Sequence, residues 1–476
     1  MFADSAVRPA IAANRFGLGA RPGELVSVAG DPRGWLLGQL AGPYRPPEAL
    51  AGLSSGREVL ATYFAAREAR EAARKSARAG ADPVKVAVDG VREQLLPHYL
   101  AQATARTRAA LQSADSFRER LVHFWTNHFA VSIDKPVCLG TAGALENEAI
   151  RPHVLGRFRD LLLAVETHPA MVTYLDNQQS VGPHSALATK ASRRGRFFAP
   201  QPKNRLGLNE NLAREILELH TLGVDGGYSQ TDVTSFAAVL TGWSVGGGKG
   251  RLAEGEPGTF VFRASVHEPG AKVVVGRRYA DAGFEQGARV LEDLCRHPST
   301  ARHLATKLAR HFVADDPPPA LVARLADAFR ASDGELTALY RALIESDEAW
   351  EPDSRKFKTP GDFVYSTFRA LELEPKDPKK LLAGFELLGQ RQFSPGSPAG
   401  WPDRQADWDG ADALMKRIEW SVAVGERVGN AHSALGAADV ALGPLAGEHT
   451  RSSLARASSG AQALTLFLMS PEFQRR

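Results

Sequence analysis

Cysteine is scarce in this chain. Its 476 residues include two cysteines, Cys138 and Cys295, and a disulfide framework or a cysteine-based zinc site needs more than two. One disulfide between them is the most that the sequence allows. A chain of this length buries about three quarters of its unfolded surface when it folds, so a hydrophobic core can stabilise it without cross-links.

Long apolar runs are also missing. No segment comes near the roughly 18 consecutive apolar residues that a membrane-spanning helix needs, so the sequence predicts no membrane span. Residues 1–10 lack the basic region followed by an apolar run that marks a signal peptide. We therefore expect a cytoplasmic protein.

Neither sign of charge is in large excess. The chain has 58 Lys and Arg residues against 54 Asp and Glu residues, a net charge of +4, which is too small to indicate nucleic-acid binding by itself. Basic side chains do gather in the segment 178–208, which is rich in turn-forming residues and is expected to be a loop. This loop either covers an anionic ligand or is simply solvated. Its basic residues are Lys190, Arg193, Arg194, Arg196, Lys203 and Arg205.

Several familiar catalytic motifs are absent. The chain has no Gly-x-Ser-x-Gly nucleophile motif and no catalytic-cysteine context. The glycine-rich run 246–250 lacks the glycine spacing, and the hydroxyl after lysine, of a phosphate-binding loop. His267-Glu268 is not followed by the second histidine of a zinc protease. The sequence therefore offers no recognised nucleophile motif, zinc-protease motif or phosphate-binding loop.

Helical periodicity, by contrast, extends along most of the chain. We predict a mainly α protein with one large multi-helix core, a small β-hairpin and long loop insertions. The hairpin is expected to pair residues 259–262 with residues 272–275, which are rich in β-forming residues. Within one domain, 1–476, the expected sub-regions are N-terminal helices with an exposed excursion (1–115), a central core (116–243), a Gly-rich loop with the hairpin (244–283) and C-terminal helices (284–476).

The predicted helix 209–221 carries a polar stripe on an otherwise apolar surface. At 100° per residue, its polar side chains fall within an arc of roughly 100°. The stripe consists of Asn211, Arg214, Glu215 and Glu218. A helix with apolar flanks of this kind is mostly buried, and buried charges need partners or a ligand.

A second helix, predicted over 116–132, repeats this pattern. Its stripe, an arc of roughly 120°, consists of Glu119, Arg120, His123, Thr126 and Asn127. Helical proteins build sites from polar side chains that face each other across neighbouring helices. We therefore expect the two stripes to meet away from bulk water.

Facing stripes would form an acid–base or metal site. Glu215 and Glu218 would then act as general acid or base with His123 as partner, provided that burial raises a carboxylate pKa. Together with His267, which follows a predicted strand, the same three residues would offer oxygen and imidazole ligands to a divalent metal such as iron, manganese or zinc. The sequence thus suggests an enzyme with a buried polar site suited to metal binding.

Other interpretations of these residues stay open. Arg120 and Arg214 could instead neutralise Glu119, Glu215 and Glu218 in a buried ion-pair network, or the stripes could face solvent. A non-catalytic binding or assembly module would need no such site.

Two more groups of residues have a functional and a structural interpretation. His128 and His220 lie on apolar helix faces and are expected to be core histidines rather than ligands. Trp401 and Trp408 with Asp403 could form a sugar-stacking surface, but anchors that pack a loop on the core are favoured.

Motifs along nearly the whole chain, taken together and in order, resemble a bacterial family, the domain of unknown function numbered 1800. The most specific segment is Asn209 to Tyr228 with Leu240-Thr241-Gly242-Trp243. The other matching segments are 14–20, 124–129, 150–153, 158–162, 174–177, 307–308, 311–313, 357–360, 400–403 and 470–473.

The resemblance implies a partner more clearly than an activity. The family carries no assigned catalytic residues, so none is transferred to this chain. Its members are often encoded beside a second family, the domain of unknown function numbered 1501, which is similar to alkaline phosphatases and sulfatases and is often exported. The resemblance therefore suggests an alternative role as an accessory or assembly module of such a partner, with export together with that partner.

Overall fold

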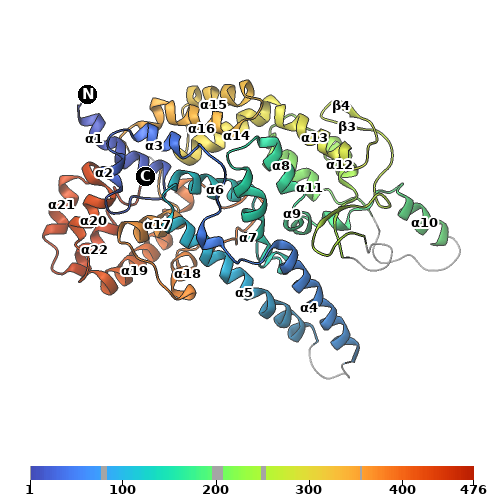
Figure 1. Ribbon diagram of the computed structural model, residues 1–476, viewed down its shortest axis with the longest axis horizontal. Helices are drawn as coiled ribbons and strands as arrows, with labels where there is room; N and C mark the ends of the chain where they lie inside the picture. The colour runs from blue at the N-terminus through green and yellow to red at the C-terminus, as the bar shows by residue number, and fades with distance from the viewer. Residues whose placement is uncertain (1, 77–82, 196–206, 248–253, 354–355) are drawn as a thin grey trace.

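Helices account for most of the chain, as the periodicity predicts. The computed structural model describes residues 2–76, 83–195, 207–247, 254–353 and 356–476. These residues form a mainly α structure with two small two-stranded sheets. Figure 1 shows the C-terminal helices gathered at one end of an elongated body and the strands at the other.

The helices of the first half begin with those that precede α6. Before it lie α1 (Phe2–Ile11), α2 (Glu24–Val28), α3 (Pro32–Gly38), α4 (Gly56–Ser76) and α5 (Pro83–Gln112). Then follow α6 (Ser116–His128), α7 (Thr141–Leu145), α8 (Phe158–Glu166), α9 (Pro169–Tyr174), α10 (Ala186–Gly195), α11 (Asn211–Glu215) and α12 (Gln230–Leu240). Short 3-10 turns connect several of these helices at η2 (Glu48–Leu50), η3 (Pro136–Cys138), η5 (Arg151–His153) and η6 (Asn177–Gln179).

The second half is almost entirely helical. Its helices are α13 (Phe284–Arg296), α14 (Pro298–Phe312), α15 (Pro319–Ala331), α16 (Leu336–Glu345), α17 (Pro360–Ala370), α18 (Pro378–Leu387), α19 (Ala411–Val428), α20 (Ala434–Ala441), α21 (Glu448–Ala455) and α22 (Gly460–Leu468). Its 3-10 turns are η9 (Asp347–Trp350), η10 (Gln405–Asp407) and η11 (Gly443–Leu445).

Three π-helices interrupt or extend α-helices. They are η1 (Ala12–Phe16), η4 (Glu146–Ile150) and η7 (Ile216–His220). A π-helix has i→i+5 hydrogen bonds and more residues per turn than an α-helix, so it rotates the side chains that follow it. The predicted helix 209–221 is therefore α11 followed by η7, and its downstream side chains depart from the 100° spacing.

The expected strands exist but pair differently. Strand β2 (Phe260–Phe262) pairs with β1 (Trp243–Val245), and β3 (Lys272–Val274) pairs with β4 (Arg277–Tyr279), both antiparallel. The predicted pairing of 259–262 with 272–275 is wrong, because each strand finds a nearer partner that periodicity alone did not reveal.

Two other local predictions need correction. The segment 178–208 is not only a loop, because α10 forms within it. Three of its basic residues, Arg196, Lys203 and Arg205, lie outside the described residues, as does part of the glycine run 246–250. Helix α5 continues through Pro97, where the sequence suggested a break. At the N-terminus of α12, where the sequence offered Ser229 or Thr231 as the start, Ser229 is the N-cap and forms a reciprocal capping box with Asp232.

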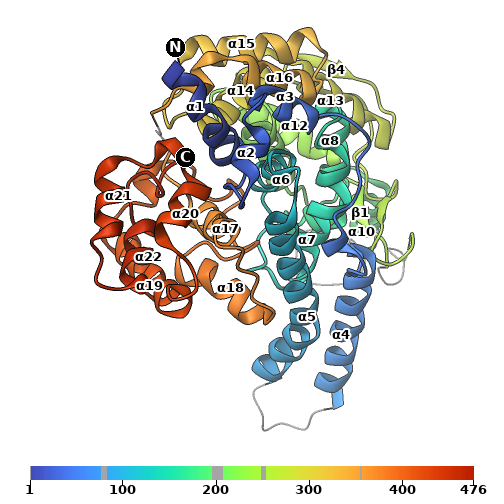
Figure 2. The same ribbon diagram turned by 60° about the vertical axis from the view of Figure 1, so that its left-hand side comes forward.

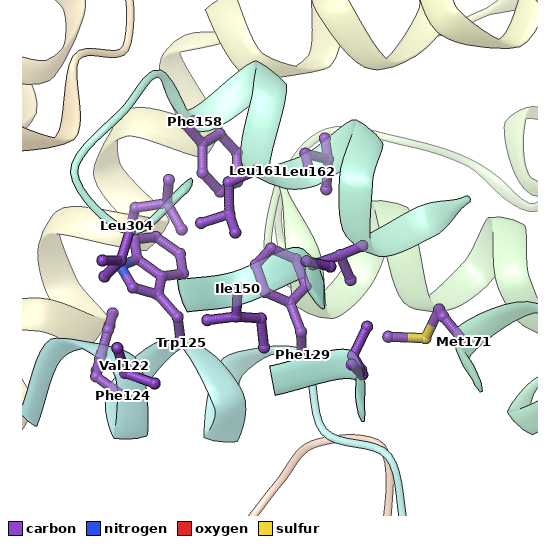
Figure 3. Close-up of a cluster of buried hydrophobic side chains, with 14 of the residues drawn as sticks. Val122, Phe124, Trp125, Phe129, Ile150, Phe158, Leu161, Leu162, Met171 and Leu304 are labelled. Atoms are coloured by element: carbon purple, nitrogen blue, oxygen red, sulfur yellow. The ribbon is translucent and has the colours of Figure 1, made fainter. Parts of the chain in front are cut away.

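The main hydrophobic core lies around α6. Figure 3 shows Trp125 and Phe129 of α6 packed with Phe158 and Leu161 of α8. The indole Nε1 of Trp125 donates a hydrogen bond to the Tyr340 hydroxyl at 2.6 Å, so this deeply buried polar atom is satisfied. One side of α6 is thus committed to the core, which leaves its polar stripe to face another way.

A second hydrophobic cluster joins the C-terminal helices α17 to α22, with contributions from Leu18 and the end of α5. The organisation of the chain as one domain, 1–476, stays a prediction. In the described part of the chain, no helix is long and apolar enough to cross a membrane.

Helices α4 and α5 pack against each other as an antiparallel pair that projects from the body (Figures 1 and 2). The outer part of α4 is mostly exposed, as its charge-rich sequence predicts. Near its base, Tyr63 and Phe64 are half-buried against the main core.

Candidate functional site

A cavity of about 110 Å³ lies beside α6. We call it the α6 cavity. Side chains from widely separated segments line it: Leu18, Arg106, Arg120, His123, Thr126, Asn127, His311, Thr359, Asp362, Tyr365, Arg391, Gln392, Trp401 and Asp403. Four residues of the polar stripe of α6, Arg120, His123, Thr126 and Asn127, therefore face a partly open cavity of mixed polar and apolar lining. The walls opposite them come from α5, α14, α17 and the loop 390–403.

The base of the stripe is neutralised by a buried ion-pair network. Arg151 makes two hydrogen bonds to Glu119, at 2.6 and 2.7 Å, and a third to Glu146 at 2.7 Å. Arg106 donates a further one to Glu146 at 2.6 Å. Burial alone would raise the pKa of Glu119, but the charge and hydrogen bonds of Arg151 outweigh it and hold that pKa well below its usual range.

A second charged group closes the opposite wall. Arg120 forms an ion pair with Asp362 at 3.0 Å, and Arg476 contacts the other oxygen of Asp362 at 3.0 Å. Burial, together with the charge of Arg476, lowers the pKa of Arg120 to about 10. The predicted network in which Arg120 neutralises Glu119 is thus corrected: both residues are paired, but with partners that are distant in sequence.

Two carboxylate–histidine pairs lie at this cavity. In the first, the imidazole Nε2 of His123 is 3.5 Å from an oxygen of Glu119, and its ring stacks on Tyr365. In the second, Nδ1 of His311 is 3.2 Å from Asp403, while Nε2 of His311 has no hydrogen-bond partner in the described part of the chain. The contact with Asp403 orients the imidazole of His311 and fixes which nitrogen carries the proton. Nε2 of His123 lies near Glu119 without forming a hydrogen bond among the described residues.

Both histidines are neutral at pH 7. Burial, assisted by the charge of Arg106, lowers the pKa of His123. Burial lowers the pKa of His311 to about 4, although the charge of Asp403 opposes the shift. A neutral imidazole with a free nitrogen can accept a proton, so the cavity contains two candidate bases.

The loop 396–409 is fixed to α6 by Asn127. The side-chain amide of Asn127 accepts a hydrogen bond from the backbone N–H of Trp401 at 2.7 Å and donates one to the carbonyl of Trp401 at 2.9 Å. Gly400 has φ of +84°, and a Cβ there would lie 2.2 Å from the Asn127 carbonyl oxygen. Trp408 is buried and its indole donates to Pro402, so it is an anchor, whereas half-buried Trp401 lines the cavity.

The stripe of α11 lies elsewhere. Arg214 pairs with Glu210 at 3.0 Å rather than with Glu215 or Glu218. Glu218 accepts a long hydrogen bond from Tyr228, and burial raises the pKa of Glu215. Asn211 is exposed at the start of α11. None of these four stripe residues lines the α6 cavity.

The two helices meet through their other faces. Nε2 of His128, at the end of α6, lies 3.1 Å from the carbonyl oxygen of His220 in η7, and Nδ1 of His220 lies 2.7 Å from Glu166. Both histidines are 1% exposed and belong to the core, as predicted. His128 lies about 140° around α6 from His123, so this contact turns the polar stripe of α6 away from η7 and towards the α6 cavity.

The expected metal centre is therefore not assembled. His267 donates its Nδ1 hydrogen to the carbonyl of Thr241 at 2.8 Å and has Asp281 as its nearest acid, at 3.8 Å. Burial lowers its pKa. Neither His267 nor Glu215 accompanies His123 in the α6 cavity. Among the residues that the structure describes, no group of three or more His, Cys, Asp or Glu side chains is placed to hold a metal ion.

Comparison with known families agrees with the motifs. The family model described as "Protein of unknown function (DUF1800)" matches residues 11–475. The chain belongs to the DUF1800 family. No match was found among curated proteins or among solved structures.

Some of the motifs that carry the DUF1800 resemblance meet at the α6 cavity, although the most specific one, Asn209 to Tyr228, does not line it. Five of these segments contribute lining side chains or hold a lining side chain in place: 14–20, 124–129, 311–313, 357–360 and 400–403. For example, the carbonyl of Gly17 accepts a hydrogen bond from Arg120 at 2.6 Å. Segments that are up to about 390 residues apart thus build one site.

Sequence reasoning missed half of this site. Asp362 was not singled out, His311 stood in a family motif without an assigned role, and Asp403 was considered only as part of a sugar-stacking surface. Glu146, in η4, and Arg151, in η5, were not singled out either. The only available signal was that His311 and Asp403 belong to the same family pattern as His123.

Proposed function

We propose that this chain is an enzyme that performs general acid–base catalysis on a small anionic substrate in the α6 cavity. The single observation that carries the proposal is that His123 and His311 both line one cavity, each with a carboxylate beside it: Glu119 at 3.5 Å and Asp403 at 3.2 Å. Carboxylates that orient imidazoles are a recurring arrangement for proton transfer.

His311 is assigned the role of general base. Asp403 accepts the hydrogen of its Nδ1, so Nε2 carries the lone pair that can take a proton from the substrate or from a water molecule. His123, once protonated, would return a proton to the leaving group or to an intermediate. A bound anion would raise the pKa of both imidazoles towards neutrality, which matches them to this task only when substrate is present.

The substrate charge follows from the cationic lining. Arg391 lies over the ring of Tyr99 at 5.2 Å, and no ion pair links it to a carboxylate of the described residues. Arg106 and Arg120 add buried positive charge but are already paired. The lining also contains no serine or cysteine within the part of the chain that is described, which favours direct proton transfer over a covalent intermediate on such a nucleophile.

Turnover measurements with matched histidine variants test the proposal. The purified protein is incubated with small anionic esters, amides, phosphate monoesters and hydroxy acids, and conversion is followed by NMR. Removing a general acid or base costs about 10²- to 10⁴-fold in rate, so H311N and H123N should each lose turnover to that extent. H303N is the control, because His303 is on the same helix as His311 but does not line the cavity.

Two results would contradict this function. A turnover that survives in both H311N and H123N would show that the chemistry takes place elsewhere. Equal loss in H303N would show that the effect is one of stability rather than of proton transfer. The metal-assisted version, with Glu215, Glu218 and His267 as ligands of a divalent ion beside His123, would need these groups to rearrange and is not favoured.

A second candidate function is that of an accessory module of a phosphatase- or sulfatase-like partner of the domain of unknown function 1501 family. It is favoured by the projecting α4–α5 pair, which offers a long exposed helical surface (Figure 2). Co-expression with such a protein tests this role: the complex should form with the full chain and be lost when the outer turns of α4 and α5 are removed. Residence in the cytoplasm, or export with that partner, stays a prediction for cell fractionation.

A further inference from the structure

A second cavity, with a volume of about 560 Å³, lies beside α4. We call it the α4 cavity. Its volume is in the range of small-molecule binding sites, and it shares no lining residue with the α6 cavity. Tyr63 and Phe64 of α4 form one wall, and Gln178 of η6 and Arg263, directly after β2, form the others.

Arg263 is a buried cation that makes no direct ion pair among the described residues, although the charge of exposed Glu254 acts on it from farther away. The residue is 4% exposed, and its guanidinium donates to the Ser244 hydroxyl at 2.6 Å and to the Val245 carbonyl at 2.7 Å. Its Nε has no hydrogen-bond partner, and no carboxylate of the described residues forms an ion pair with it. Burial lowers its pKa. An unpaired buried charge is costly, so a bound anion would find a prepared partner here.

Other cations in the structure are compensated in ways that Arg263 is not. Arg417 also lacks a carboxylate, but its guanidinium lies over the rings of Phe357 and Phe363, at 4.3 and 5.2 Å. Lys135, which lines the α4 cavity, pairs with Asp176 at 2.7 Å. Arg67 of α4 also lines the cavity, but it is exposed to solvent. Arg263 is therefore the buried cation that an anionic ligand in this cavity would contact.

The remaining lining defines the rest of the ligand. The Oε1 atom of Gln178 is buried without a hydrogen-bond partner and can accept a hydrogen bond from a ligand donor. The half-buried aromatic side chains Tyr63 and Phe64 offer a surface for a flat apolar body.

From this arrangement we infer that the α4 cavity binds a small aromatic monocarboxylic acid. The carboxylate lies against Arg263, where Nε–H and a free N–H of the guanidinium form a planar fork that matches its two oxygens. The aromatic body lies against Tyr63 and Phe64. A hydroxyl or amino group on the ligand donates to Gln178.

Calorimetric titration tests this site. The probes are phenylacetate and 4-hydroxyphenylacetate, compared with neutral phenylacetamide and with inorganic phosphate. Both acids should bind the wild-type protein, and phenylacetamide and phosphate should bind at least tenfold more weakly. R263K keeps the positive charge but loses the fork, so both acids should bind it at least tenfold more weakly. R391K, altered in the α6 cavity, should bind them as the wild type does.

Several outcomes would overturn the assignment. The wild-type protein could bind neither acid with a Kd below ~10 mM. It could bind phenylacetamide or phosphate as tightly as the two acids. R263K could bind the acids as tightly as the wild type does. If R263K does not fold, as judged by its thermal unfolding, F64A replaces it, and undiminished binding of the acids to F64A overturns the site. Loss of binding in R391K would assign the acids to the α6 cavity, which supports the proposed function instead and refutes this one.

Discussion

Replacement of Arg151 by methionine should be among the most destabilising single changes in this protein. Arg151 is 1% exposed and bridges Glu119 and Glu146. Methionine fills much of the same space but leaves Glu119 as a buried charge without a cationic partner, because Arg106 still compensates Glu146. Breaking a buried ion pair in this way costs about 3–5 kcal/mol of unfolding free energy.

The cost should depend on pH in a defined direction. In the wild type, the pKa of Glu119 is held low by Arg151, so its contribution to stability is present at neutral pH and is lost in acid. In R151M, the same carboxylate is buried without that partner, so either Glu119 or the neighbouring His123 takes up a proton on folding. As the pH falls by one unit within the range of that titration, the unfolding free energy of R151M therefore rises by up to about 1.4 kcal/mol relative to that of the wild type. The stability difference between the two proteins becomes smaller towards acid pH.

Urea unfolding at pH 7.5 and pH 5 measures both effects. The double variant R151M/E119Q, which removes the uncompensated charge, should be more stable at pH 7.5 than R151M alone. R324M is the matched surface control, because Arg324 pairs with Glu348 where it is 49% exposed, and such pairs contribute about 0–1 kcal/mol. A loss below about 1 kcal/mol for R151M, or a loss that does not change with pH, would refute the account of this network.

Three further predictions concern other parts of the structure. Gly400→Ala should lower the unfolding temperature markedly, because φ is +84° and the added Cβ would lie 2.2 Å from the backbone carbonyl oxygen of Asn127. Gly396→Ala is the control and should leave it unchanged, because a Cβ there meets nothing within 4 Å. Equal unfolding temperatures of the two variants would contradict this explanation. The pKa of His311 falls from 6.5 to about 4 on folding, so the unfolded chain binds this proton more tightly than the folded one. As the pH falls from 7.5 to 4.5, His311 should therefore lower the free energy of unfolding by about 2.5 kcal/mol. H311N should lack this part of the pH dependence in urea titrations. Cys138 and Cys295 are buried free thiols whose pKa is raised by burial, to about 12 for Cys138, so neither should react with a thiol reagent until urea unfolds the chain.

The local patterns of this chain could be predicted from its sequence. The shared face of Arg120, His123 and Asn127 follows from helical periodicity, and the capping box at Ser229 follows from spacing alone. Both depend on neighbours within one helix, so nothing outside that helix could alter them.

The partners of those residues could not be predicted in the same way. Asp362 and Asp403, which complete the site, lie more than 200 residues from His123, and periodicity carries no information on which distant segments meet. The stripe of α11 was expected to complete the site because it carries a similar pattern, but the contact of His128 with His220 fixes the two helices through their other faces.

The three π-helices suggest how polar side chains came to be redirected in this fold. A π-turn holds one residue more than the α-turn it replaces, so each corresponds to a single inserted residue that the helix accommodates without breaking. In η1 the widened turn contains Asn14, whose amide donates to the Ala441 carbonyl of α20 at 2.7 Å. In η4 it contains Glu146, which accepts from both Arg106 and Arg151. Removing one residue from either turn would restore α-helical geometry and keep the helix content. It would also rotate Asn14 or Glu146 away from the partners that it contacts in distant parts of the chain.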